Sequence, residues 1–179
     1  MRLTFGGVIL RKITAFLIVF VLLLSVSCAK KESSGQELYT TRPFTCIAEI
    51  SYDNLSLEAK LTYRNAAGAT LEVLSPDSFE GLIFEYNGEE TRAFYKGISF
   101  SLGSLNSSLP SAAKLIFSSL VYASNQKDTR DAGEHFVISG RLDSAQYELY
   151  FNKKSGYLEK FICPSLNFEA KFKDFKFLE

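Results

Sequence analysis

The stretch FTCIAEISYDNLSLEAKLTY, residues 44–63, alternates apolar with polar side chains along most of its length. Because successive side chains of a β-strand point to opposite faces of a sheet, this period of two predicts half-buried antiparallel strands. The residues that would share the apolar face of the first strand are Phe44, Cys46, Ala48, Ile50 and Tyr52. The stretch therefore predicts a sheet that buries one face.

Similar stretches follow along the chain and bring the predicted total to about ten strands. Asn87-Gly88 separates two of them and indicates a hairpin, because both residues tolerate positive φ. The further strands are predicted at 70–74, 82–86, 91–95, 98–102, 135–142, 146–151, 157–163 and 166–173. Residues 125–134 are charged and are predicted to form a loop.

Residues 108–124 break this pattern, because their apolar side chains recur at helical spacing. Ser108 is suited to cap a helix there, and Pro110 falls in its first turn, where a missing N–H does no harm. The chain is therefore predicted to be mainly β, of the α+β class. It combines a curved antiparallel sheet with one amphipathic helix against it.

A sheet of about ten strands curls or closes, and a single helix would cover only part of its concave apolar face. Either that face packs as a dry core, or it leaves a pocket for an apolar ligand, as in small barrels that hold one molecule. The periodicity alone favours the core. The candidate lining residues are Ile50, Leu61, Phe84, Ile116, Leu120, Phe168 and Phe172.

The first 27 residues have the pattern of a secretory signal. Arg2, Arg11 and Lys12 form a basic leader, and the uncharged run 13–26 is shorter than the ~20 residues that cross a bilayer. The ending Ser25-Val26-Ser27-Cys28 resembles a bacterial lipobox, although Ser25 stands where Leu is usual. The alternative is a plain signal peptide followed by a chance cysteine.

The lipobox resemblance implies cleavage before Cys28 and attachment of acyl chains, palmitate among them, to that cysteine. Two or more acyl chains hold a protein firmly on a bilayer. The polar residues 28–41 then form a tether, and 42–179 form one domain. We expect the extracytoplasmic face of a cell membrane, or the outer membrane in a Gram-negative host, since Ala29 is no retention signal of the Asp type.

The composition of the mature chain limits the kinds of molecule that it is expected to bind. The chain has 20 basic and 20 acidic residues, and the leader carries only basic ones, so the remainder has a small acidic surplus. A nucleic-acid partner is therefore not expected. Cys46 and Cys163 could form a disulfide outside the cytoplasm, or both could be buried free thiols; the sequence leaves both possibilities open.

The sequence lacks the residues and motifs that most enzyme mechanisms require. His135 is the only histidine, and no G-x-S-x-G, P-loop or G-x-G-x-x-G motif is present. Zinc sites need several nitrogen or sulfur ligands at short spacing, and the cysteines are isolated. We therefore expect no catalytic residues, no metal and no cofactor, and we interpret His135 as a surface residue.

The order of segments resembles a known superfamily. A lipobox and tether precede the strand 44–52, followed by the strands at 69–76 and 81–88, a helix after Pro110, and a closing pair at 147–158. This resembles the bacterial lipoprotein carriers LolA and LolB and the lipid-binding lipoproteins LppX and LprG. The resemblance implies an unclosed β-barrel whose hollow accommodates acyl chains. The longer members have an additional N-terminal helix, which this sequence lacks.

Two functional hypotheses follow. The first is a membrane-anchored lipoprotein that binds a lipid or another apolar ligand in the concave face of its sheet. The second is a non-catalytic interaction or adaptor module of a cell-envelope complex, with a plugged core and a protein partner docked on strand edges.

Overall fold

The computed structural model describes residues 42–65, 68–101, 108–125 and 129–178. These residues belong to one compact unit, Ser34–Glu179. The predicted signal, lipidated Cys28 and tether lie outside the described residues. Within the described ranges, no helix has the length and hydropathy that a membrane span requires.

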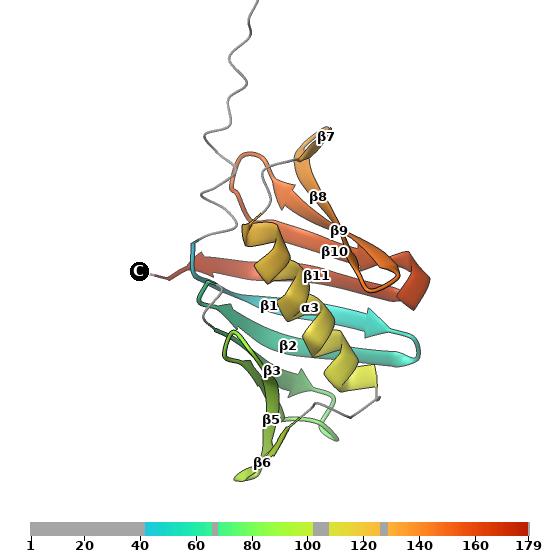
Figure 1. Ribbon diagram of the computed structural model, residues 1–179. Coiled ribbons are helices and arrows are strands. Elements are labelled where there is room, and N and C mark those ends of the chain that lie inside the picture. The colour runs from blue at the N-terminus through green and yellow to red at the C-terminus, as the bar shows by residue number, and fades with distance from the viewer. Residues whose placement is uncertain (1–41, 66–67, 102–107, 126–128, 179) are drawn as a thin grey trace, which may run out of the picture. The chain divides into compact units, whose positions relative to one another are not determined.

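Eleven strands form one antiparallel sheet in the order β6-β5-β4-β3-β2-β1-β11-β10-β9-β8-β7, which is not closed (Figure 1). The strands of the first half are β1 (Phe44–Tyr52), β2 (Leu55–Tyr63), β3 (Ala69–Ser75), β4 (Ile83–Tyr86), β5 (Thr91–Tyr95) and β6 (Ile98–Ser101). Those of the second half are β7 (Arg130–Ala132), β8 (His135–Leu142), β9 (Ala145–Asn152), β10 (Leu158–Cys163) and β11 (Phe168–Phe177). The predicted mainly β fold with one helix is confirmed.

Helix α3 (Ser108–Ser124) connects the two edges of the sheet and crosses the strands on one face (Figure 1). The chain runs outward from β1 to β6, crosses through α3 to β7, and returns to the centre, where β11 pairs with β1. At its C-terminal end, the Asn125 side-chain amide donates to the Val121 carbonyl at 2.9 Å. Such side-chain bonds satisfy the last carbonyls of a helix.

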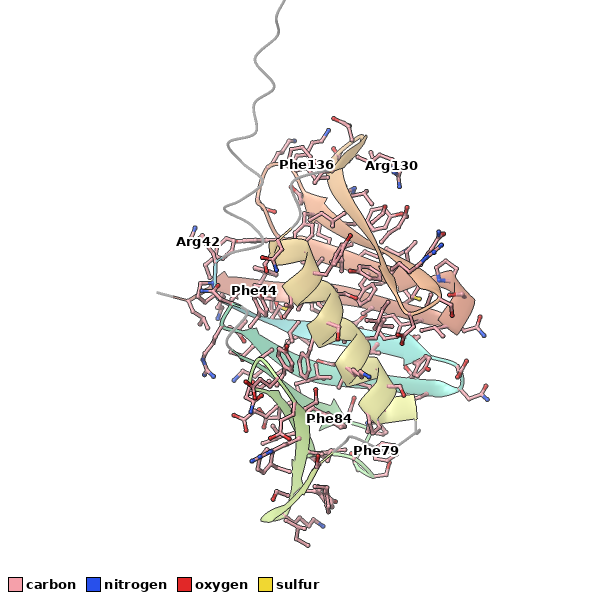
Figure 2. The ribbon with its side chains drawn as sticks, viewed as in Figure 1. Arg42, Phe44, Phe79, Phe84, Arg130 and Phe136 are labelled. Carbon is pink, nitrogen blue, oxygen red and sulfur yellow. The ribbon has the colours of Figure 1, made fainter. Side chains whose placement is uncertain are left out.

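The face of the sheet that α3 covers, called the inner face here, carries the core. On β1 and β2 the alternate residues predicted for one face are buried, among them Ile50 and Leu61. Side chains fill the layer between the sheet and α3 (Figure 2). The period of two in the sequence thus identified the buried face correctly.

Several strand boundaries differ from the sequence prediction by one or two residues, and Pro164–Leu166 form a short 3-10 helix before β11. Two differences are larger. Arg130–Ala132 form strand β7 inside the predicted charged loop, because an edge strand of three residues needs no apolar alternation. Strand β11 continues to Phe177, beyond the predicted end at residue 173. A bulge opposite Thr45 and Ile47 includes Asp174 at φ 53°, and it shifts the alternation so that Phe175 and Phe177 pack against the core.

The disulfide considered from the sequence is not formed, and Cys46 and Cys163 are both buried free thiols. Cys163 pairs with Phe168, which pairs with Tyr52, so Cys163 lies level with a residue six positions beyond Cys46 on β1. At about 3.3 Å per residue this offset is about 20 Å, whereas bridged Cα atoms lie within roughly 7 Å. The register of the sheet therefore keeps the two thiols apart.

Candidate functional site

The candidate site is the layer between α3 and the inner face of the sheet. Helix α3 approaches β8 and β4 across this layer. One side of the helix is buried along its whole length, whereas Lys114 and Tyr122 are exposed. The buried residues of α3 are Leu109, Ala112, Ala113, Leu115, Ile116, Phe117, Ser119, Leu120 and Ala123. Three alanines among them allow the helix to lie close to the sheet.

All seven residues predicted to line the concave face belong to one core cluster: Ile50, Leu61, Phe84, Ile116, Leu120, Phe168 and Phe172. They come from β1, β2, β4, α3 and β11, and none is more than 8% exposed. The structure therefore brings together side chains that lie far apart in the sequence. That they contact a ligand remains a prediction.

Three buried hydroxyl groups lie in this otherwise apolar layer, and the sequence analysis did not single them out. Among the described residues, the hydroxyls of Tyr63, Ser119 and Tyr147 find no hydrogen-bond partner. Ser119 is completely buried, and the two tyrosines are 1% and 2% exposed. A signal for Ser119 exists in the sequence, because it lies three residues after Ile116 and four before Ala123, on the apolar stripe of the helix.

The serines of α3 lie close to the two phenols without bonding them. Burial raises the pKa of Tyr147 to about 12, and the nearby Ser119 hydroxyl partly opposes this effect. Burial also raises the pKa of Tyr63, with Ser124 opposing it. The Ser124 hydroxyl donates to the Val121 carbonyl at 2.7 Å. A buried hydroxyl without a partner costs about 1–3 kcal/mol, so each of the three could bond a ligand atom or a water.

A groove of about 600 Å³ opens beside Tyr147. Its wall includes Tyr122, which meets the Tyr147 ring edge-on with the centroids 6.1 Å apart. Arg141 and Gln146 also line the groove, but they pair with each other one position along from Gly140 and Tyr147, so their side chains point to the opposite face of the sheet. Tyr147 thus belongs both to the buried layer and to the groove, and it links the interior to the surface.

A second groove lies on the other face of the sheet and is polar. Unlike the groove beside Tyr147, it is not lined by any of the three partnerless hydroxyls. It is lined by side chains of β1, β2 and β11, including Glu49 and Glu169. Lys173 bonds Glu49 at 2.6 Å and lies 3.8 Å from Glu58, so these charges neutralise one another at the surface. Among the described residues, no group of His, Cys, Asp and Glu side chains is arranged to hold a metal ion.

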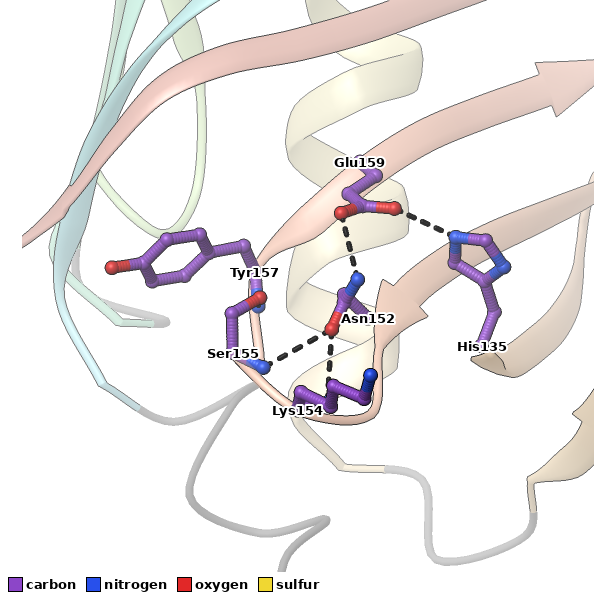
Figure 3. A network of polar contacts seen from close by, with 6 residues as sticks. All are labelled: His135, Asn152, Lys154, Ser155, Tyr157 and Glu159. Atoms are coloured by element: carbon purple, nitrogen blue, oxygen red, sulfur yellow. Dashed lines mark hydrogen bonds and ion pairs between the residues drawn. The ribbon is translucent and has the colours of Figure 1, made fainter. Parts of the chain in front are cut away.

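His135 takes part in a network of polar contacts at the surface (Figure 3). Its Nε2 lies 2.7 Å from a Glu159 carboxylate oxygen, and the Asn152 amide donates to the other oxygen at 2.9 Å. The side-chain carbonyl oxygen of Asn152 accepts hydrogen bonds from the backbone N–H groups of Lys154 and Ser155. The network therefore joins the start of β8 to the β9–β10 turn.

Comparisons with known proteins bear on the fold. Neither a family model nor a curated protein matches the chain. Similar solved structures include an uncharacterised conserved protein from Thermus thermophilus, with a TM-score of 0.50 and 16% identity over 81% of this chain and 84% of that one. They also include a LolA superfamily protein from Nitrosomonas europaea, with a TM-score of 0.36 and 8% identity over 81% and 91% of the two chains.

The lipoprotein LppX from Mycobacterium tuberculosis is also similar, with a TM-score of 0.42 and 11% identity over 80% of this chain and 91% of that one. The predicted unclosed antiparallel sheet with a single α-helix is confirmed among the described residues, and the Thermus thermophilus protein is similar to this chain in fold. At these identities the likeness concerns the fold alone.

Proposed function

We propose that this chain is a non-catalytic lipoprotein that binds a lipid or another apolar ligand between α3 and the inner face of its sheet. The observation that carries the proposal is the set of three partnerless hydroxyls, Tyr63, Ser119 and Tyr147, within an apolar layer. A well-packed core has no use for such groups, whereas an amphipathic ligand needs a few polar contacts among many apolar ones.

The groove beside Tyr147 gives the ligand an orientation. Its apolar part would lie among the buried side chains around Leu120 and Phe172, and its polar part would face the Tyr147 and Ser119 hydroxyls. Entry requires α3 to move away from the sheet, because the lining residues are buried in the structure.

A membrane anchor at Cys28 would place this site next to its ligand source. The support for the anchor is the sequence alone, from the basic leader to Cys28. Metabolic labelling with palmitate tests it directly. Label should enter the wild-type chain and not Cys28→Ala, and the variant should leave the membrane fraction. Labelling of Cys28→Ala, or its unchanged membrane retention, would contradict the anchor.

The test of ligand binding is mass spectrometry on residues 29–179 purified from a bacterial host. The native mass is compared with the mass after denaturation and organic extraction. We expect a stoichiometric lipid that extraction releases. Ser119→Ala and Tyr147→Phe should retain less of it, because each removes one polar contact. Ser118→Ala is the matched control, since Ser118 is the neighbouring serine on α3 and is only half-buried.

A bare polypeptide mass, unchanged after incubation with membrane lipids, would instead favour the second candidate, an interaction module with a plugged core. The observation on its side is the deep burial of all seven candidate lining residues. In that case the partner would be sought on the strand edges, by crosslinking in membranes.

A further inference from the structure

The two edges of the sheet differ in their protection against pairing with another strand. The edge strand β7 is three residues long, and both of its charged side chains form ion pairs. Arg130 lies 2.8 Å from Glu148, and Asp131 lies 2.6 Å from Lys153. Short, charged edges are how β-proteins prevent association.

The opposite edge strand, β6, is also short, with four residues, but among the described residues it carries no charged side chain. All four of its residues, Ile98–Ser101, are exposed, and the sequence from Gly97 to Ala113 contains no charged residue. Ile98 is 61% exposed and Phe100 is 42% exposed. Figure 1 shows β6 at the end of the sheet. An uncharged edge with exposed apolar side chains is typical of a strand that pairs with another chain.

The apolar side chains of β6 lie on the inner face. Phe100 pairs with Ala93, and Ala93 pairs with Phe84, both of which are buried there. Ile98 is two residues from Phe100 and so shares its face. The row of apolar residues on the inner face therefore continues to the edge and ends uncovered by other described residues.

The turn before β6 determines which backbone groups point outward. Lys96 and Gly97, at φ 48° and 83°, form a two-residue turn, and Tyr95 pairs with Ile98 across it. In such a hairpin the closing pair is hydrogen-bonded, and bonded pairs alternate along the ladder. Ile98 and Phe100 thus bond to β5, while the N–H and C=O groups of Ser99 and Ser101 face away from the sheet.

We propose that β6 pairs antiparallel with β6 of a second copy of this chain, about a two-fold axis through Ser99. In this register Ser99 exchanges both backbone hydrogen bonds with the partner's Ser99. Ile98 then lies opposite the partner's Phe100, and Phe100 lies opposite the partner's Ile98. Outward-facing groups meet outward-facing groups, and apolar side chains meet on the same face, as antiparallel pairing requires.

A second copy fits this edge because the pairing is self-complementary. No like charges face each other, since residues 97–101 contain no charged residue. The contact between Ile98 of one copy and Phe100 of the other occurs twice, once on each side of the axis. A two-fold axis through Phe100 would instead place the Phe100 ring opposite the Phe100 ring of the second copy. It would leave Ile98, the more exposed residue, opposite residue 102, outside the described strand.

The size of this contact determines where the dimer forms. Stable interfaces bury about 1,200–2,000 Å². A contact between two four-residue strands is much smaller. Pairing in dilute solution is therefore weak. If the proposed anchor at Cys28 confines copies to one bilayer surface, their effective concentration rises and the same contact suffices. This step alone rests on the proposed function, and palmitate labelling tests it separately.

Cysteine crosslinking tests the pairing on the full chain in bacterial membranes. In Ser99→Cys the two thiols lie at the axis, where Cα atoms of a bonded pair are about 5.5 Å apart, within disulfide reach. Ser101→Cys is the matched control, because the partner's Ser101 is four residues away from the residue opposite, about 13 Å along the strand. The wild-type chain, which has Cys28 and the buried Cys46 and Cys163, gives the background.

We expect mild oxidation to yield several-fold more disulfide-linked homodimer from Ser99→Cys than from Ser101→Cys. Adding Ile98→Lys to Ser99→Cys should reduce the yield, because the ammonium would oppose the partner's Phe100. Adding Leu74→Lys, at another exposed apolar residue, should leave it unchanged. Three results would each overturn the proposal. They are equal yields from Ser99→Cys and Ser101→Cys, a crosslink to a different protein, and a homodimer that forms with Phe100→Cys but not with Ser99→Cys.

Discussion

Gly140 lies directly opposite Tyr147 in the β8–β9 ladder, and the Tyr147 ring fills the space that a side chain at Gly140 would need. A Cβ atom at Gly140 would lie 2.3 Å from Cζ and from the hydroxyl oxygen of Tyr147. The glycine therefore fixes the position of the phenol that links the groove to the buried layer.

Gly140→Ala should destabilise the protein by about 1–3 kcal/mol, because the added methyl group must displace a packed ring. Urea denaturation of residues 29–179 measures the change in the free energy of unfolding. In the double variant Gly140→Ala with Tyr147→Ala the clash is gone, so the two effects should be less than additive. Full additivity would contradict the contact.

The stability of the protein should fall between about pH 10 and pH 12. Burial raises the pKa of Tyr147 from 10.0 to about 12, so the folded state keeps a proton that the unfolded state loses. The stabilisation is fully present below the unfolded pKa and disappears as the pH approaches the folded one, by up to about 2 kcal/mol. Denaturation at several pH values should show a smaller decrease for Tyr147→Phe, and an identical decrease would contradict the assignment.

Both cysteines of residues 29–179 should resist alkylation in the folded protein and react after unfolding. The thiolate is the reactive form, and burial raises the pKa of Cys46 to about 12. Mass spectrometry after treatment with iodoacetamide should find no modified thiol under native conditions and two in denaturant. Two unreactive cysteines in denaturant without reductant would reveal a disulfide and overturn the strand register.

Leu120→Ala should destabilise the ligand-free domain by about 2–5 kcal/mol, the usual range for truncating a buried leucine. Leu120 is 3% exposed and packs between α3 and the sheet. Lys114→Ala, on the exposed side of the same helix, should change the free energy of unfolding by less than about 0.5 kcal/mol. A loss at Leu120 as small as that at Lys114 would mean that this part of the layer is not tightly packed.

The sequence predicts the fold well wherever alternation is regular, as on β1 and β2. It fails at β7, where three edge residues give no periodic signal, and after Lys173, where the bulge at Asp174 reverses the alternation. Distances such as that between Cys46 and Cys163 depend on the register of intervening strands, which no local pattern contains.

The candidate site shows the same limit. The seven apolar lining candidates could be chosen from periodicity, because buried positions recur at fixed spacing. Ser119 could have been found in the same way, from its place on the apolar stripe of α3, but the Tyr63 and Tyr147 hydroxyls could not, since a tyrosine can keep its hydroxyl in solvent while its ring is buried. Only the packing of α3 on the sheet decides that the Tyr63 and Tyr147 hydroxyls are enclosed.

The pairing of β11 with β1 has a consequence for how the protein matures. The first strand has one neighbour, β2, close in sequence, but its other neighbour, β11, begins only at Phe168. The middle of the sheet therefore cannot be completed until β11 is available. Non-local pairing of this kind slows folding. If the predicted signal directs the chain across a membrane, slow completion of the sheet would keep the polypeptide extended during transport until β11 is available.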